Sequence, residues 1–290
     1  MPWLNRLLRS ESPKLARPGR TAVGLVLQRT RWSERLRIQR DGYVLPFFAS
    51  SNMALTYWAV PGRIDATEDI VKRLLGASDV FVDVGANVGT VTAVAALAVG
   101  PTGRVVAIEP HPSTFRNLER TVAVNGFTNV VCRQVACGAA AGSVLFSDER
   151  RKDDNNRVQT GAPSDRGRGP ATVHVPSVPL GDVLRDLAVT RVDLLKVDVE
   201  GFELDVLRGM GPTLELVGLI HVEAIEHNLN GFGATVDSLV VFLTDHGFQC
   251  FGVADDPANL VAARPERLPA LHASCGERIR PLDPGTRGDP

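Results

Sequence analysis

The stretch VFVDVGANVGTVT, residues 80–92, decides the fold of this chain. Its first five residues are nearly all apolar, which is typical of a short strand covered on both faces of a sheet. Gly85 and Gly89 then bracket a tight turn that leads into a helix of small apolar residues. Because glycine has no Cβ and tolerates positive φ, the backbone can bend sharply here and a ligand can approach it closely. The pattern predicts a strand, a ligand-binding turn and a helix.

The segments on either side continue a regular alternation of strands and helices. Short apolar runs predict strands, and apolar residues at helical spacing predict helices. The predicted strands lie at 80–84, 104–108, 129–136, 144–146, 192–197, 217–222 and 248–253, and the predicted helices at 65–76, 90–99, 113–125, 202–208 and 235–246. Strands that alternate with helices form parallel βαβ units with right-handed crossovers. The sequence therefore predicts an open α/β sheet.

Composition and charge divide the chain into parts. Residues 1–40 form a basic N-terminal extension with ten Lys or Arg and two Glu, and residues 41–254 form the main domain. Within it, residues 41–62 carry aromatic side chains that are expected to pack or to cap a pocket, and residues 148–171 form a polar insertion. Residues 255–290 are expected to be a C-terminal tail. The basic start is either a solvated extension or a weak attractor of an anionic membrane, nucleic acid or acidic partner.

The composition of the whole chain excludes several classes of protein. Hydrophobic residues make up 44% and charged residues 22% of the 290 residues, which excludes a disordered chain and a fibrous protein. No apolar run reaches the roughly 18–20 residues that a membrane-spanning helix needs. The start lacks the pattern of a secretory signal, so we expect a cytoplasmic protein with reduced thiols. Cys132 and Cys250 are expected to fill the core.

The spacing of the turn narrows the class of its ligand. A dinucleotide-binding turn reads G-x-G-x-x-G and a phosphate loop carries a Lys, whereas this turn reads G-x-x-x-G without one. Asp83 precedes the turn and would repel a phosphate. A cationic ligand suits this carboxylate, and S-adenosylmethionine carries both a sulfonium and an ammonium group. We expect Asp83 to organise its methionine end; an ordinary helix-capping Asp is the alternative.

Glu109 ends the second predicted strand, in the segment RVVAIEPHP. A carboxylate at this point can accept hydrogen bonds from both ribose hydroxyls of an adenosine. The alternative is a surface Glu at a strand end. Together with the glycine turn, Glu109 favours an adenosine-binding edge of the sheet.

Three segments together resemble the FkbM family of S-adenosylmethionine-dependent methyltransferases. They are VDVGANVGT (82–90), AIEPHPSTFRNLERTVAVNG (107–126) and DLLKVDVEGFELDVLRGM (193–210). The resemblance implies a class I methyltransferase fold, which is a Rossmann-like, seven-stranded, mainly parallel sheet with helices on both faces and one antiparallel strand. It also implies methyl transfer, usually to a hydroxyl oxygen on a sugar, glycolipid or secondary metabolite.

The resemblance also assigns positions in this chain to the cofactor. It places Asp83, Gly85, Asn87 and Gly89 in the cofactor loop and Glu109 at the ribose. Val135 and Ala136, at the end of the third predicted strand, would flank the adenine.

The segment KVDVEGFE supplies the candidate reacting groups. Asp198 emerges at the carboxyl end of a predicted strand, and Glu200 and Glu203 follow in the turn. Clustered carboxylates raise one another's pKa, which hints at function, although Glu203 is also well placed to cap a helix. Asp198 and Glu200 are therefore candidate catalytic residues. Lys196 can pair with a carboxylate or place its charge near the acceptor, and the sequence does not decide between these roles.

A second rim element is HVEAIEHN, residues 221–228, at the end of the next strand. Glu223 is the third candidate catalytic residue, and His227 and Asn228 are further candidates. Asp198 serves as a base or, together with Glu223, as a ligand of Mg²⁺. No metal site is assigned beyond this possibility.

Two alternatives to a small-molecule O-methyltransferase stay open at this point. One is a non-catalytic adenosine-binding domain, which the intact Asp83 and Glu109 disfavour. The other is an RNA methyltransferase, which the basic start favours but the acidic body disfavours. An amino-directed enzyme would commonly show N/D-P-P-Y/F where this chain has D-V-E-G. We expect a small hydroxyl acceptor and no nucleic-acid partner.

Overall fold

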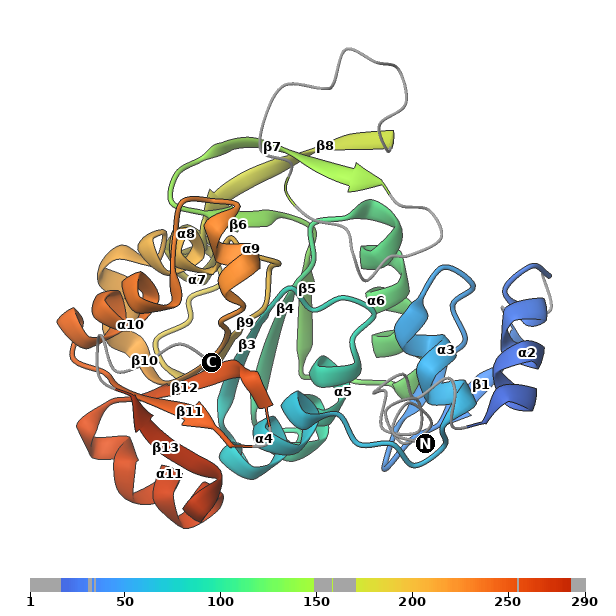
Figure 1. Cartoon of the computed structure of the whole chain (residues 1–290), viewed down its shortest axis with the longest axis horizontal. Coiled ribbons are helices and arrows are strands. Elements are labelled where there is room, and N and C mark those ends of the chain that lie inside the picture. Colours follow the sequence, from blue (N-terminus) through green and yellow to red (C-terminus); the bar gives the residue numbers. More distant parts are fainter. Residues whose placement is uncertain are drawn as a thin grey trace, which may run out of the picture.

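The computed structural model describes residues 17–30, 33, 35–148, 158, 171–254 and 256–282. Its centre is an eight-stranded sheet with the order β13-β11-β12-β10-β9-β3-β4-β5 (Figure 1). Five neighbouring strands run parallel: β3 (Val80–Val84), β4 (Arg104–Ile108), β5 (Val130–Arg133), β9 (Val192–Val197) and β10 (Val217–Glu223). The predicted Rossmann-like, mainly parallel sheet is confirmed.

The C-terminal edge of this sheet is antiparallel. β12 (Asp256–Ala263) pairs with β10 on one side and with β11 (Gln249–Val253) on the other, and β13 (Ile279–Leu282) pairs with β11. In the described residues the sheet therefore has eight strands rather than seven, and β12 and β13 both run against the parallel strands.

The expected C-terminal tail is corrected by these strands. Residues 256–282 form β12, η5 (Pro265–Arg267), α11 (Leu268–Cys275), η6 (Gly276–Arg278) and β13. The physical reason is the apolar run Leu260–Ala263, which is completely buried between β10 and β11. Residues 255 and 283–290 of the expected tail lie outside the described residues.

Helices cover both faces of the sheet, as predicted. One face packs against the helices α7 (Leu180–Asp186), α8 (Glu203–Arg208) and α10 (Val236–Asp245). The opposite face packs against α4 (Ala66–Leu74), α5 (Thr90–Val99), α6 (Pro112–Asn125) and α11. Side chains alternate along β3, so that Val82 and Val84 enter the first core and Phe81 the second.

The N-terminal part forms a unit beside α5 and α6 (Figure 1). Its elements are α2 (Pro18–Leu27), β1 (Arg37–Gln39), β2 (Val44–Pro46) and α3 (Asn52–Ala59). Its buried aromatic residues are Tyr43, Phe47, Phe48 and Tyr57. The prediction that these aromatics pack is confirmed. The expected extension over 1–40 is corrected in its described part, which folds against α3, and residues 1–16 lie outside the described residues.

A buried ion pair fastens this unit to α4. Arg40 places Nη2 2.7 Å from Oε2 of Glu68, and its guanidinium lies 3.7 Å from the centre of the Tyr57 ring. The Tyr57 hydroxyl donates to Oε1 of Glu68 at 2.7 Å. Because both charged side chains are almost completely buried, this contact fixes the connection between α3 and α4.

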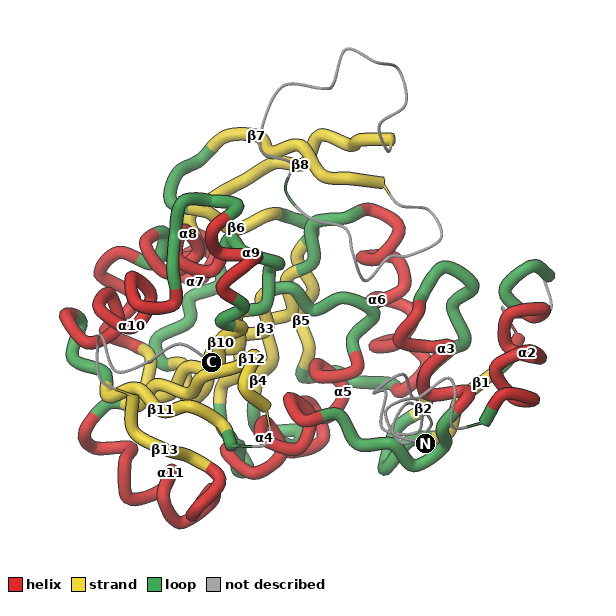
Figure 2. Tube along the Cα trace, in the orientation of Figure 1, coloured by secondary structure: helices red, strands yellow, loops and turns green. Residues whose placement is uncertain are grey.

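A small second sheet lies above the main one (Figure 2). It has the order β6-β8-β7 and consists of β6 (Ala136–Gly138), β7 (Gly142–Asp148) and β8 (Ala171–Pro179). The strand predicted at 129–136 is therefore divided between β5 and the start of β6. Apart from residues 148, 158 and 171, the predicted polar insertion lies outside the described residues. The remaining elements are η4 (Gly211–Leu216) and α9 (Glu226–Asn230).

All four cysteines are free thiols. Cys132 lies in β5 and Cys250 in β11. Burial raises the pKa of each of these two thiols to about 11, so both stay protonated at neutral pH. Their predicted packing role is confirmed, because both contact the hydrophobic cores.

Candidate active site

The turn between β3 and α5 presses its backbone against the end of β9. Gly85 has a φ of +78°, and a Cβ on it would lie 1.8 Å from the carbonyl oxygen of Asp198, so that a side chain does not fit. The amides of Gly85 and Ala86 both donate to the carbonyl of Ile108 at 3.0 Å. Gly89, with a φ of +86°, begins α5. The turn is therefore fixed to the ends of three strands.

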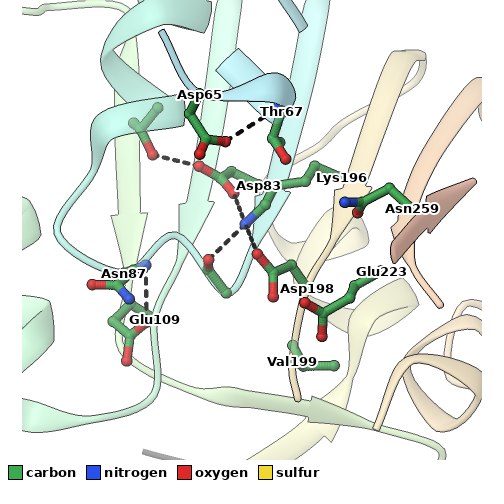
Figure 3. Close-up of polar contacts among 12 residues, drawn as sticks. Asp65, Thr67, Asp83, Asn87, Glu109, Lys196, Asp198, Val199, Glu223 and Asn259 are labelled. Atoms are coloured by element: carbon green, nitrogen blue, oxygen red, sulfur yellow. Dashed lines mark hydrogen bonds and ion pairs between the residues drawn. The ribbon is translucent and has the colours of Figure 1, made fainter. Parts of the chain in front are cut away.

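Asp83 lies beneath this turn. Its side chain is completely buried, and the Thr92 hydroxyl donates to its Oδ2 at 2.6 Å. Its Oδ1 lies 3.1 Å from the ammonium group of Lys196 (Figure 3). The charge of Asp83 is thus balanced from within the protein. This placement supports a structural role for Asp83 and gives no support to the expected contact with a methionine end.

Lys196 links the turn to β3 and to the end of β9. Its Nζ donates to the carbonyl of Gly85 at 2.7 Å, and it lies 3.1 Å from Asp83 and 3.5 Å from Asp198 (Figure 3). The contact with Gly85 is a hydrogen bond, and the contacts with the two carboxylates are ion pairs. Burial opposes its charge, but the carboxylates of Asp83 and Asp198 outweigh burial and raise the pKa of Lys196. Lys196 is therefore a fixed cation and not a proton acceptor.

Glu109 ends β4 on the other side of the turn. Its Oε2 accepts from the amide of Asn87 at 3.0 Å (Figure 3). Its Oε1 accepts from the amide of His111 at 2.9 Å. Burial raises the pKa of Glu109 to about 7, even though both backbone hydrogen bonds act to lower it. Each oxygen of the carboxylate retains acceptor capacity, so Glu109 can still bind a diol.

Three carboxylates meet at the ends of β9 and β10. Asp198 follows β9, Glu200 lies in the next turn and Glu223 ends β10. Asn228 donates to Oε2 of Glu200 at 3.1 Å and to Oε2 of Glu223 at 3.5 Å. Burial, reinforced by the charges of Asp198 and Glu200, raises the pKa of Glu223 to about 9. Without a ligand, Glu223 therefore holds a proton at neutral pH.

Glu203 shapes the turn that carries Glu200. Its Oε1 accepts from the amides of Val199 and Gly201, both at 3.0 Å. A Cβ on Gly201 would lie 2.4 Å from the carbonyl oxygen of Asn228, so this turn packs tightly against the segment after β10. Glu203 does not line the cavity; it lies in the first turn of α8, and its hydrogen bonds hold the preceding turn rather than cap the helix.

A cavity of about 250 Å³ opens between these groups at the carboxyl ends of the parallel strands. Its carboxylates are Asp65, Glu109, Asp198, Glu200 and Glu223. Its apolar lining comes from Met53, Val84, Ala86, Val91, Ile108, Pro110, Val135, Ala136, Cys137, Phe146, Val158, Val199 and Phe202. Among the described lining residues the one basic side chain is Lys196, which is buried. The cavity therefore combines several carboxyl groups with an apolar lining.

The structure brings most of the predicted site residues together. Those that line the cavity are Gly85, Asn87, Glu109, Val135, Ala136, Asp198, Glu200 and Glu223. Asp83 and Gly89 lie behind the turn and do not line it. Asn228 reaches two of the carboxylates, whereas His227 is exposed to solvent outside the cavity.

The sequence offered residues 41–62 as a cap over a pocket but singled out no residue of the cavity's outer wall. Met53 of α3 lines it, as do Asp65 and Thr67 at the start of α4. Asp65 caps α4 by accepting from the amide of Thr67 at 3.1 Å (Figure 3). The sequence DAT signals this helix cap but carries no signal of a cavity. Phe202 could have been found, because it lies within the segment KVDVEGFE.

The geometry does not fit a bound metal ion. Among the described residues, no group of three or more His, Cys, Asp or Glu side chains is arranged to hold one. Asp198 and Glu223 lie at one rim, but Asp198 already faces Lys196. The expected Mg²⁺ site is therefore not supported.

Comparison with known proteins identifies the family of this chain. The model of the methyltransferase FkbM domain matches residues 83–250. The methyltransferase sdnD of Sordaria araneosa is 30% identical over 200 residues, which are 60% of this chain and 75% of that protein. This chain belongs to the FkbM methyltransferase family. As an FkbM protein it is an S-adenosylmethionine-dependent methyltransferase, and the non-catalytic alternative is set aside.

Two further proteins are similar to this FkbM methyltransferase. Hexuronic acid methyltransferase AglP of Haloferax volcanii is 30% identical over 162 residues, which are 54% of this chain and 61% of that protein. The crystal structure of the methyltransferase FkbM from Methylobacillus flagellatus KT has a TM-score of 0.41 at 17% identity and covers 64% of this chain and 43% of that chain.

Proposed function

We propose that this FkbM methyltransferase transfers the methyl group of S-adenosylmethionine to a hydroxyl oxygen of a neutral small molecule, such as a sugar, a glycolipid or a secondary metabolite. The observation that carries the proposal is the acidic cavity, in which Glu109 lies near the backbone turn and Glu223 lies at the opposite rim beside Asp198. The part of the cavity beside Glu109 can hold an adenosine, and the part beside Glu223 can accept the proton of an alcohol.

The cavity residues fit S-adenosylmethionine by their chemistry. Gly85 leaves the backbone accessible, and Glu109 keeps acceptor capacity for ribose hydroxyls. Val135 and Ala136 offer apolar surface for the adenine. The carboxylates of Asp198 and Glu223 suit the positive charges of the ligand. When bound, S-adenosylmethionine supplies a methyl group made electrophilic by a positively charged sulfur.

Glu223 is the group that we assign to the acceptor proton. An alcohol is a poor nucleophile until its proton is removed, so a base beside it accelerates the transfer. Asp198 already faces the Lys196 ammonium at 3.5 Å. Glu223 has no such partner among the described residues, and a cation bound in the cavity lowers its raised pKa. Its carboxylate can then accept the proton, while Asp198 orients the acceptor.

The charge of the cavity restricts the acceptor. Five carboxylates line it, and its one described basic side chain is buried and already contacts three acceptors. A carboxylate acceptor, such as the hexuronic acid in the name of the Haloferax volcanii relative, would be repelled. The phosphates of an RNA would be repelled for the same reason. Neutral hydroxyls avoid this repulsion and can donate hydrogen bonds to the carboxylates.

The test is a methyl-transfer screen with S-adenosylmethionine that carries a deuterated methyl group. The panel contains neutral glycosides, glycolipids and polyketide alcohols, with hexuronic acids and an RNA oligomer as the charged arms. We expect a labelled methyl ether, which resists mild alkali. A labelled methyl ester, which mild alkali hydrolyses, or labelled RNA would replace our assignment of the acceptor.

A further inference from the structure

Helix α2 exposes several apolar side chains to solvent and packs on α3 through Arg20 and Gly24. Its sequence, PGRTAVGLVL, contains two polar side chains, Arg20 and Thr21. Arg20 stacks 4.9 Å from the centre of the Trp58 ring and donates from Nε to the Trp58 carbonyl at 3.0 Å. Gly24 packs so closely on α3 that a Cβ would lie 2.4 Å from Leu55. Arg20 and Gly24 thus hold the helix against α3.

The outer face of α2 is unusually apolar for a surface helix. Val23, Leu25 and Val26 are 51%, 49% and 63% exposed. They are three of the seven large hydrophobic side chains that are exposed in the described residues. A surface helix normally shows polar side chains to water, so this reversal marks a face that binds something apolar.

Positive charge lies at both ends of α2 and in the segment that follows it. Arg17 and Arg29, at the two ends of α2, are exposed, and so are Arg35 and Arg37 in the following segment. The first 40 residues carry ten Lys or Arg and two Glu, whereas the chain as a whole has a net charge of −1. The partner of this face is therefore expected to combine an apolar part with negative charge.

We propose that α2 and its neighbouring arginines form a docking surface for a membrane that contains anionic phospholipids. An interfacial helix places its apolar face at the boundary between headgroups and acyl chains, while Lys and Arg attract anionic headgroups. The phosphates of an RNA would attract the arginines, but an RNA offers no apolar layer that Val23 and Val26 could enter. None of the described helices is long and apolar enough to cross a membrane, so α2 would lie on its surface.

The position of α2 relates this surface to the active site. α2 packs on α3, and Met53 of α3 lines the cavity described above. One helix therefore separates the docking surface from the outer wall of the cavity (Figure 1). A docked enzyme would hold that wall near the membrane, although the proposal does not depend on which acceptor is methylated.

Vesicle flotation of the full chain tests the proposal. The probes are vesicles of phosphatidylcholine alone and of phosphatidylcholine with an equal amount of phosphatidylglycerol. We expect binding to the anionic vesicles alone, with a strong decrease in high salt. The double variant Val23→Glu with Val26→Glu should lower the vesicle-bound fraction about tenfold. Val241→Glu, on α10, is the matched control because Val241 is 42% exposed, and it should bind as the wild type does.

Two further measurements keep the test decisive. Circular dichroism checks that the Val23→Glu, Val26→Glu protein is folded, and Arg17→Glu with Arg29→Glu tests the charge separately and should also weaken binding. The proposal is overturned if the wild type ignores anionic vesicles or if the double valine variant binds them as well as the wild type. It is also overturned if light scattering shows a dimer that the valine substitutions dissociate while no vesicles are bound, because a second copy would then cover the face.

Discussion

Asp83 and Glu109 end neighbouring strands of the sheet, yet their charges are balanced in different ways. Asp83 faces the ammonium of Lys196 and the hydroxyl of Thr92, and it is completely buried. Glu109 accepts two backbone amides and has no ion-pair partner within the described residues. The protein itself supplies the counter-charge of the first carboxylate, whereas the second has no counter-charge among the described residues and retains acceptor capacity for a ligand. Burial alone therefore does not distinguish a binding carboxylate from a structural one; the partner does.

The largest effect is expected from Lys196→Met. The substitution leaves Asp83 without its cation in a buried site and removes the bond to the Gly85 carbonyl. We expect the free energy of unfolding to fall by about 3 to 5 kcal/mol, measured by urea denaturation. Lys72→Met is the control, because the pair of Lys72 with Asp41 is exposed, and it should cost less than about 1 kcal/mol. Equal losses in both variants would mean that Lys196 is not the buried link that we describe.

The next largest effect is expected on turnover from Glu223→Gln. The amide is isosteric but cannot take the acceptor proton, so kcat should fall about a hundredfold or more. Calorimetry in buffers of different ionisation enthalpy should show that S-adenosylmethionine binding releases a proton in the wild type and not in the variant. The demethylated product of S-adenosylmethionine lacks the sulfonium, so its binding should release fewer protons. Unchanged turnover in the variant would mean that a residue other than Glu223 is the base.

Glu109→Gln sharpens the comparison with Asp83 directly. The variant loses a charged acceptor for hydroxyl groups, so the affinity for S-adenosylmethionine should fall about 10- to 100-fold by calorimetric titration. The free energy of unfolding should change little, because burial already disfavours the charge of Glu109. Asp83→Asn should show the opposite pattern, with a larger loss of stability. Glu119→Gln, at an exposed position on α6, is the control for both.

The smallest effect concerns the pH dependence of stability. The pKa of Glu223 is raised from 4.5 to about 9, so the folded protein binds a proton there that the unfolded chain has released. Its contribution to stability is fully present below about pH 4.5 and is lost as the pH rises toward 9. Glu223→Gln should flatten this decline between pH 5 and 9, measured by urea denaturation. Exposed Glu215 offers a control, since Glu215→Gln should leave the slope unchanged.

The parallel half of the sheet and its binding edge could be predicted from the sequence. Buried strands are recognised in the sequence as apolar runs, and the glycines of VDVGANVGT mark the turn that approaches β9. Glu109, Asp198 and Glu223 follow such runs directly, so the carboxyl ends of parallel strands bring them to one edge. This local pattern suffices because parallel strands share a direction.

Other features depend on contacts that the pattern does not show. Asp83 was expected at the ligand because it precedes the turn, but its side chain follows Phe81 onto the α5 face and meets Lys196 from another strand. β12 was missed because it begins with DPAN, which reads as a loop, and its apolar end is short. Asp65 reaches the cavity through the α3–α4 connection, whose position is set by the distant contact between Arg40 and Glu68.

The place of β3 in the sheet has a consequence for synthesis on the ribosome. β3 pairs with β4 on one side and with β9 on the other, and β9 ends at Val197. Until the nascent chain has been synthesised as far as Val197, the edge of β3 that pairs with β9 has no partner strand. Such an edge is a template for pairing with other chains, and distant parallel pairing forms slowly. The side of β3 that faces β9 therefore stays without its partner strand until the chain has been synthesised as far as Val197.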